Sequence, residues 1–316
     1  MIMPESGAVA FIGIGNMGLP MVSRLVATGH RVHGYDVAPE ALARLEDVGA
    51  TGHPTAAAAA AAAELVILML PNSAIVNAVV DDLVASGAVS PSTVVIDMSS
   101  SEPLSTRALA DTLREVGVAL VDAPVSGGVK GAVSGTLTVM VGGDEAAVAR
   151  ALPVISELGR PVRCGAVGSG HAIKALNNLL SATHLWATSE AMEVGVAFGL
   201  DPEVMISVFN TSSGRSGSTE NKWPNFILPG TYDSGFGLAL MLKDMRIALG
   251  LADSTGSPRA LSSSAVELWA EAATGMPATA DHTEIARWVA AFASGTNERT
   301  AAPRPWKGIE SGVEAQ

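Results

Sequence analysis

Apolar and polar residues alternate along the first half of the chain in a pattern of strands and helices. An apolar run at 8–14 ends in glycines, a helical pattern follows at 17–28, and a second apolar run lies at 31–35. More strand-like runs follow, separated by helical stretches such as 104–116, and they lie at 65–70, 94–98, 119–122 and 136–141. Repeated strand–helix units predict an α/β fold with a mostly parallel, doubly wound sheet.

An alanine-rich run at 56–63 belongs to the same alternation. Alanine is the best helix former, and Pro54-Thr55 supplies a start, so we predict a short helix there. The run is only weakly hydrophobic, is followed by Glu64, and falls short of the roughly 20 apolar residues that a membrane span needs. We therefore expect no membrane segment.

The pattern changes after about Cys164, where the strand signals end. Residues 172–198 carry apolar residues at helical spacing over an unusual length, Gly199 follows as a stop, and Asp201-Pro202 begins the next helix. Further helical segments are predicted at 203–210, 238–252, 261–274 and 284–292. We therefore expect an α/β domain at 1–163, a long helix leading into an all-α domain at 164–293, and a mobile tail at 294–316.

Composition and charge narrow the class of protein. The chain has 316 residues, of which 48% are hydrophobic, and this is enough to form the cores of two domains. Its 19 basic and 31 acidic residues give a net charge of -12, so we expect neither nucleic acid nor an anionic membrane as a partner. Because the chain has one cysteine, Cys164, and no signal-peptide pattern at its start, we expect a cytoplasmic protein.

A G-x-G-x-x-G motif lies between the first predicted strand and the first predicted helix. In this context Gly13 permits a tight turn, Gly15 lets the backbone approach a pyrophosphate, and Gly18 allows the helix to pack closely on the strand. The motif predicts a Rossmann-type dinucleotide site. The turn residues expected to contact the cofactor are Gly13, Ile14, Gly15, Asn16, Met17 and Gly18.

The choice of dinucleotide depends on Asp36, which follows the second predicted strand. A carboxylate there can accept hydrogen bonds from the adenosine ribose and would repel a 2′-phosphate, which favours NAD over NADP. The alternative is a turn residue before Pro39. Arg44 leaves NADP possible, and FAD enzymes share the glycine motif, so the glycines alone do not decide the cofactor.

Several motifs in order resemble the 3-hydroxyisobutyrate dehydrogenase family of β-hydroxyacid dehydrogenases, which is related to 6-phosphogluconate dehydrogenase. The motifs are FIGIGNMGLPM, LMLP, IDMSS, DAPVSGG, GSGHAIKALNN and GFGLALMLKD, and the resemblance covers residues 8 to about 291. It implies a Rossmann domain joined by a long helix to an all-helical domain. It also implies oxidation of 3-hydroxy acids, or reduction of the corresponding semialdehydes, with NAD(P).

The resemblance places a catalytic lysine at Lys174, in GSGHAIKALNN. If this lysine is partly buried, its pKa should fall, which would suit a general acid and base near neutral pH; the alternative is a solvated helix lysine. Asn177 and Asn178 follow about one turn later, and the family favours Asn178 as the substrate contact, while the role of Asn177 stays open. His171 could tune the protonation of Lys174 or be structural.

A second part of the substrate site is predicted in DAPVSGG. The loop of Ser126, Gly127 and Gly128 follows a strand on the carboxyl side of the sheet, where it can offer a hydroxyl and backbone N–H groups to a substrate carboxylate. The alternative is a flexible turn that binds nothing.

The resemblance also assigns residues to the nicotinamide half of the cofactor. Leu70-Pro71 and Ser100 end two strands that face it, and Ser100 stands where the family usually has threonine. Lys243 matches the lysine that reaches toward cofactor and substrate. Arg215, in the loop 212–218, either pairs with a substrate carboxylate or lies on a surface connection.

Other functions remain as alternatives. No His, Cys, Asp or Glu cluster has metal-ligand spacing, and no nucleophile elbow is present, so we expect neither a metal nor acyl transfer. One alternative is a semialdehyde reductase of the same family that acts on tartronate semialdehyde, succinic semialdehyde or sulfolactaldehyde. The others are an imine reductase, which usually lacks the lysine, and a non-catalytic nucleotide-binding protein. The long apolar helix predicts a homodimer or a homotetramer.

Overall fold

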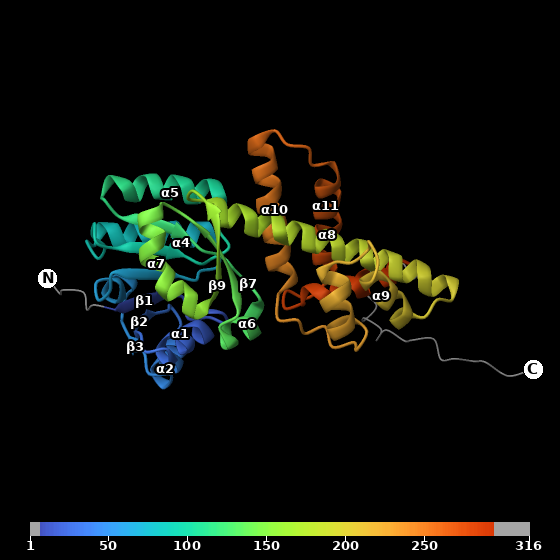
Figure 1. The fold of residues 1–316 in the computed structure, drawn as a ribbon, viewed down its shortest axis with the longest axis horizontal. Helices are drawn as coiled ribbons and strands as arrows, with labels where there is room; N and C mark the ends of the chain where they lie inside the picture. The colour runs from blue at the N-terminus through green and yellow to red at the C-terminus, as the bar shows by residue number, and fades with distance from the viewer. Residues whose placement is uncertain (1–6, 294–316) are drawn as a thin grey trace, which may run out of the picture. The chain divides into compact units, whose positions relative to one another are not determined.

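The computed structural model describes residues 7–293, and these contain one nine-stranded sheet. Its order is β3-β2-β1-β4-β5-β6-β8-β7, with β9 paired to β8 (Figure 1). The strands are β1 (Ala8–Ile12), β2 (Arg31–Tyr35), β3 (Thr51–Gly52), β4 (Leu65–Leu68), β5 (Val94–Asp97), β6 (Ala119–Asp122), β7 (Val125–Ser126), β8 (Leu137–Gly142) and β9 (Gly159–Gly165). Pairs among β1 to β6 are parallel, while β8 is antiparallel to β6 and β7. The mostly parallel, doubly wound sheet is confirmed.

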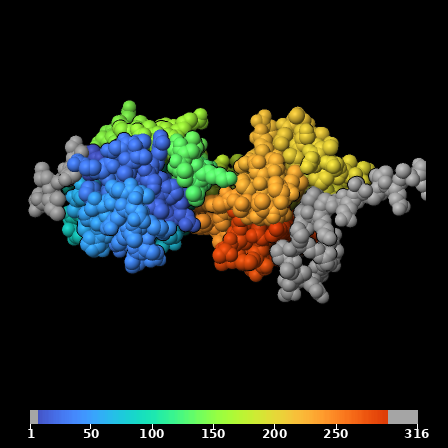
Figure 2. Space-filling model, turned by 90° about the horizontal axis from the view of Figure 1, so that it is seen from below, coloured from blue at the N-terminus to red at the C-terminus, as the bar shows by residue number. Residues whose placement is uncertain are grey.

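Helices cover both faces of this sheet, because successive strand residues point to opposite sides. In β1, Val9 and Phe11 pack into one core with α1, α2 and α7, whereas Ala10 and Ile12 pack into the other with α3, α4 and α5. The outer side of α1 and α2 forms much of the face of this unit that Figure 2 shows. The helices are α1 (Gly18–Ala27), α2 (Pro39–Asp47), α3 (Ala56–Ala60), α4 (Ser73–Ala85), α5 (Pro103–Glu115), α6 (Gly128–Ser134) and α7 (Glu145–Leu158).

After β9 the described chain is helical except for its connecting loops. The long helix is α8, and Gly199 follows it with a φ of +95°. Asp201 caps α9, since its Oδ1 accepts hydrogen bonds from the backbone N–H groups of Glu203 and Val204. The elements are α8 (Ser169–Phe198), α9 (Pro202–Asn210), the π-helix η1 (Ser218–Ile227), α10 (Leu238–Thr255), α11 (Ala260–Gly275), the 3₁₀ turn η2 (His282–Glu284) and α12 (Ile285–Ala293).

The chain forms two compact units that divide between Ala175 and Leu176, inside α8. This division lies beyond the predicted boundary at 163/164, because β9 and the first turns of α8 pack with the sheet. The predicted tail at 294–316 lies outside the described residues. Across 7–293, none of the helices has the length and apolar character needed to cross a membrane.

Candidate active site

The glycine-rich turn between β1 and α1 has two glycines that packing requires and one that it does not. A Cβ at Gly13, where φ is +98°, would lie 2.2 Å from the Met69 carbonyl oxygen, and one at Gly18 would lie 2.0 Å from the Gly13 carbonyl oxygen. A Cβ at Gly15 would meet nothing within 4 Å. The open space over Gly15 fits a phosphate group approaching the backbone at the start of α1.

Asp36 contacts this turn directly. Its Oδ2 accepts a hydrogen bond of 2.6 Å from the Ile14 N–H, and its Oδ1 accepts one of 2.9 Å from the Ala38 N–H. The carboxylate therefore joins the loop after β2 to the glycine-rich turn. Asp36 thus holds its own turn, as the alternative interpretation from the sequence expected, and its predicted contact with a ribose stays a prediction.

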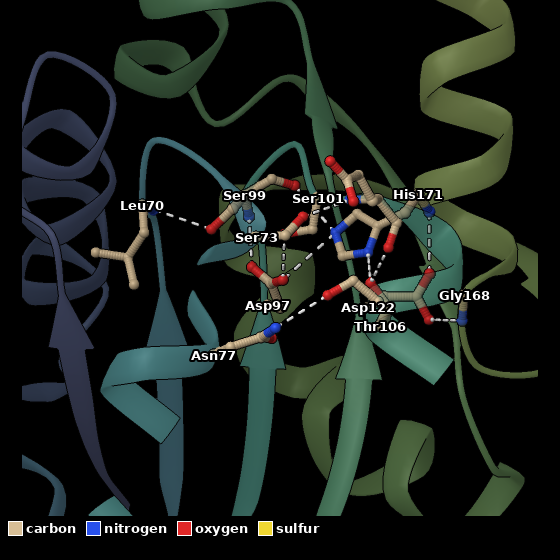
Figure 3. Close-up of polar contacts among 12 residues, drawn as sticks. Leu70, Ser73, Asn77, Asp97, Ser99, Ser101, Thr106, Asp122, Gly168 and His171 are labelled. Atoms are coloured by element: carbon tan, nitrogen blue, oxygen red, sulfur yellow. Dashed lines mark hydrogen bonds and ion pairs between the residues drawn. The ribbon is translucent and has the colours of Figure 1, made fainter. Parts of the chain in front are cut away.

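The carboxyl ends of β4 and β5 are joined by hydrogen bonds (Figure 3). The Leu70 N–H donates to Ser99 Oγ at 2.9 Å, and the Ser99 N–H donates to Asp97 Oδ1 at 2.9 Å. Ser101 Oγ donates to Asp97 Oδ2 at 2.7 Å. These bonds position the two loops that carry Leu70-Pro71 and Ser100, the residues predicted to face the nicotinamide.

His171, in the first turns of α8, is buried against the same loops. Its Nε2 lies 3.0 Å from the Ser99 carbonyl oxygen, which only accepts, so Nε2 carries a hydrogen. Nδ1 lies 2.8 Å from Thr106 Oγ1, and Nε2 lies 3.7 Å from Asp97 Oδ2. Nε2 thus holds α8 to the loop after β5 and Nδ1 holds it to α5, which favours a structural role for His171.

Asp122, at the end of β6, caps the start of α8 (Figure 3). This fully buried carboxylate accepts hydrogen bonds from the Gly168 N–H at 2.7 Å and the His171 N–H at 3.0 Å. N–H groups at a helix start have no partner within the helix, and a negative charge there is favourable. Asp122 therefore fixes where α8 begins and, through the helix, where Lys174 lies.

Lys174 lies beside the predicted carboxylate loop. Its side chain is buried, and Nζ donates a hydrogen bond of 2.7 Å to the Val125 carbonyl oxygen. Val125 immediately precedes Ser126, and the loop then turns through Gly127 and Gly128 with φ values of +127° and +62°. The structure thus brings the predicted acid–base group next to the predicted carboxylate site.

Asn178 and Lys243, which belong to the second unit, meet at Asp244 of α10. The buried Asn178 donates from Nδ2 to Asp244 Oδ2 at 2.6 Å, and Lys243 Nζ lies 3.4 Å from Asp244 Oδ1. Asn177 Nδ2 donates to Asn178 Oδ1 at 3.2 Å. This bond joins the two amides, and the role of Asn177 stays open. Arg215 is exposed and forms an ion pair of 2.7 Å with Glu220, which favours the surface alternative.

Comparison with known proteins identifies the family. Residues 8–168 match the family described as the NAD binding domain of 6-phosphogluconate dehydrogenase, and residues 168–289 match the NAD-binding family of NADP-dependent 3-hydroxyisobutyrate dehydrogenase. The mitochondrial 3-hydroxyisobutyrate dehydrogenase of Bos taurus is 40% identical over 277 residues, which are 84% of this chain and 82% of that relative. This chain belongs to the 3-hydroxyisobutyrate dehydrogenase family.

Two more members of the 3-hydroxyisobutyrate dehydrogenase family extend the comparison. The 2-(hydroxymethyl)glutarate dehydrogenase of Eubacterium barkeri is 36% identical over 271 residues, 84% of this chain and 89% of its own. A structure of the Mycobacterium tuberculosis 3-hydroxyisobutyrate dehydrogenase with L-serine has a TM-score of 0.85 at 34% identity and covers 91% of this chain and 99% of that chain. The protein is therefore an NAD(P)-dependent dehydrogenase that acts on hydroxy acids.

The sequence motifs did not predict which residues hold the candidate active site together. Asp97 and Asp122 lie within the quoted motifs IDMSS and DAPVSGG, but their partners are backbone N–H groups and side chains far away in the sequence. The buried Lys222 was also missed, because its segment is polar. Within residues 7–293 no three His, Cys, Asp or Glu side chains are grouped so that they could hold a metal ion.

Replacing Asp122 with asparagine should destabilise the protein. Each oxygen of the Asp122 carboxylate accepts from one backbone N–H group, and asparagine would put an NH2 donor in place of one of these oxygens. We therefore expect a loss of about 2 kcal/mol in the free energy of unfolding, measured by urea denaturation. The control is Asp111→Asn, which removes an exposed ion pair with Arg114 and should cost less than about 0.5 kcal/mol. Equal losses in the two variants would contradict the role assigned to Asp122.

Proposed function

We propose that this dehydrogenase oxidises a small 3-hydroxy acid, or reduces its semialdehyde, with Lys174 as the general acid and base. The observation that supports this proposal is the burial of Lys174 with Nζ 2.7 Å from the Val125 carbonyl oxygen, immediately before Ser126. NAD, when bound, accepts the hydrogen and its electron pair from C3 of the substrate. The residues of this chain bind the substrate and move the proton.

In oxidation, neutral Lys174 takes the hydroxyl proton as the C3–O bond becomes a carbonyl. One of its N–H groups is held by the Val125 carbonyl oxygen, and this hydrogen bond orients the amine beside Ser126. In reduction, the ammonium returns a proton to the oxygen. The Ser126 hydroxyl and the N–H groups of Gly127 and Gly128 bind the substrate carboxylate, and Asn178, whose Oδ1 accepts a hydrogen bond from Asn177, contacts the substrate in the following turn of α8.

The names of the relatives support a substrate class. 3-Hydroxyisobutyrate, 2-(hydroxymethyl)glutarate and L-serine are all 3-hydroxypropionates that differ in the substituent on C2. We propose a substrate with this same skeleton.

An assay of NADH absorbance tests the proposal. It uses these three compounds, lactate as a 2-hydroxy acid control, and a cyclic imine. We expect turnover of at least one 3-hydroxypropionate and none of lactate or the imine. NADH binding without turnover of any 3-hydroxy acid or semialdehyde would favour the non-catalytic alternative.

We propose NAD as the preferred cofactor, because the Asp36 carboxylate lies at the glycine-rich turn. Asp36→Asn keeps the shape of the side chain and removes the charge that repels a 2′-phosphate. We expect the ratio of NADPH to NADH affinity to rise by about tenfold, which corresponds to about 1.4 kcal/mol. Fluorescence titration with both cofactors measures this ratio, and an unchanged ratio would contradict the role of Asp36.

We also propose that the protein assembles as a homodimer or homotetramer. The long helix α8 exposes large apolar side chains at Leu176, Leu180, Val194 and Phe198. Such a face is typical of a subunit contact. A cytoplasmic location stays a prediction from the sequence.

A further inference from the structure

A buried lysine in the second unit has no role in the reaction proposed above. Lys222 lies in the middle of η1, and its side chain is only 9% exposed. A π-helix of this length is rare, and π-helical turns are frequent at functional sites. The neighbouring Trp223 and, one turn later, Ile227 are fully buried, so the packing of η1 holds Lys222 in place.

The Lys222 ammonium is not paired with an anion in the part of the chain that the structure describes. Its Nζ donates a hydrogen bond of 2.6 Å to Ser181 Oγ. Burial lowers the pKa of Lys222 to about 8, so the group is still mostly charged at neutral pH. A buried cation without a paired anion is costly, and an incoming anionic group would relieve that cost.

Asp281, the carboxylate whose charge acts on Lys222, already has other partners. It raises the pKa of Lys222 through space, but no ion pair joins the two residues in the described chain. Its oxygens accept hydrogen bonds from Ser234, Gly235, Phe236 and Thr283. These bonds hold Asp281 at the start of η2.

A second buried polar side chain, His282, has a ring nitrogen without a hydrogen-bond partner among the described residues. His282 is buried, and its Nδ1 donates to the Phe236 carbonyl oxygen at 3.0 Å, which leaves Nε2 as an acceptor. Nε2 is buried and has no hydrogen-bond partner among the described residues. Lys222 belongs to η1 and His282 to η2, and these two elements pack against each other. Burial lowers the pKa of His282, and the charge of Lys222 lowers it further, against the opposing effect of Asp281.

Ser181 places Lys222 close to Asn178, the proposed substrate contact of the second unit. Asn178 and Ser181 are spaced i, i+3 along α8 and therefore share a face. With a rise of about 1.5 Å per residue, Ser181 lies roughly 5 Å beyond Asn178 along the helix axis. A group bound at Lys222 would thus lie about one helical turn from the substrate contact Asn178.

We propose that Lys222 and Ser181 form a subsite for a second anionic group on the substrate, a carboxylate carried by the substituent on C2 of the 3-hydroxy acid. This inference rests on the proposed function and narrows its substrate class to hydroxy-dicarboxylates. Lys222 binds the second carboxylate by charge, and Ser181 positions the ammonium toward it.

The test compares two substrates that differ at one position. 2-(Hydroxymethyl)glutarate and 3-hydroxyisobutyrate share the hydroxymethyl group and the C1 carboxylate, but the first has a carboxyethyl group on C2 where the second has a methyl. In Lys222→Met, which keeps most of the length of the side chain and removes its charge, we expect kcat/KM for the dicarboxylate to fall by about 30- to 100-fold, as for a lost charge-assisted contact. We expect kcat/KM for the monocarboxylate to change by less than about threefold, since no contact with the C2 methyl is lost. The control Arg246→Met removes an exposed cation of α10 and should change neither value.

A second measurement needs neither turnover nor a variant. Calorimetry of the NADH-loaded wild-type protein should show glutarate binding at least about tenfold more tightly than butyrate, because glutarate has the second carboxylate. Equal affinity for the two acids, or equal losses of kcat/KM for both substrates in Lys222→Met, would overturn the subsite. Failure of the wild type to oxidise any 3-hydroxy acid would instead contradict the proposed function, and the binding comparison would still decide the subsite.

Discussion

Lys174→Ala is expected to lower kcat by about two to four orders of magnitude, the usual contribution of a positioned general acid or base. The variant removes the buried amine beside Ser126 that is proposed to take the substrate proton. The affinity for NADH should change by less than about twofold, because the glycine-rich turn and Asp36 are untouched. Steady-state kinetics together with fluorescence titration of NADH measure both quantities.

The variant Lys174→Arg tests whether Lys174 acts by transferring a proton or only by its positive charge. Arginine keeps a positive charge on a long side chain but cannot lose its proton near neutral pH. We expect kcat to stay as low in this variant as in Lys174→Ala, and added methylamine to restore part of the activity of Lys174→Ala. Turnover within about tenfold of the wild type in either variant would rule out Lys174 as the acid–base group.

Gly18→Ala is expected to unfold or strongly destabilise the first unit, by about 3 kcal/mol or more, because a Cβ there collides with backbone. The atom would lie 2.0 Å from the Gly13 carbonyl oxygen, which cannot move without breaking the turn. Thermal denaturation measures this loss.

The matched substitution Gly15→Ala should act on the cofactor alone. No atom lies within 4 Å of the added methyl, so the melting temperature should stay near that of the wild type. The methyl would occupy the space into which the pyrophosphate fits, and the affinity for NADH should fall by at least about tenfold. Unchanged NADH affinity in Gly15→Ala would mean that the pyrophosphate does not lie over this glycine.

The sequence predicts those parts of the fold whose signals are local. The β1–turn–α1 unit follows from an apolar run, three spaced glycines and a helical pattern, and the structure confirms it. The end of α8 at Gly199 and the cap of α9 at Asp201 were predictable for the same reason, because the required backbone conformation and hydrogen bonds lie within a few residues.

The parts that were missed depend on tertiary packing. β9 is half exposed, contains Pro161 and pairs with β8 alone among the described strands, so it lacks an apolar run. η1 is polar and contains Pro224, so its helical path and the burial of Lys222 are fixed by the residues around it rather than by its own pattern. Asp122 acts on α8 only because the sheet brings β6 to the start of that helix.

The proposed reaction moves hydride from the hydroxyl-bearing carbon of a 3-hydroxy acid to NAD while Lys174 takes the proton. It is tested by oxidation of 3-hydroxyisobutyrate, or of 2-(hydroxymethyl)glutarate, with deuterium on the carbon that carries the hydroxyl, followed by mass spectrometry of the NADH formed. We expect one deuterium on the nicotinamide ring in the wild-type reaction and almost no labelled NADH with Lys174→Ala. Unlabelled NADH from the wild type, or labelled NADH at an undiminished rate from Lys174→Ala, would contradict this reaction.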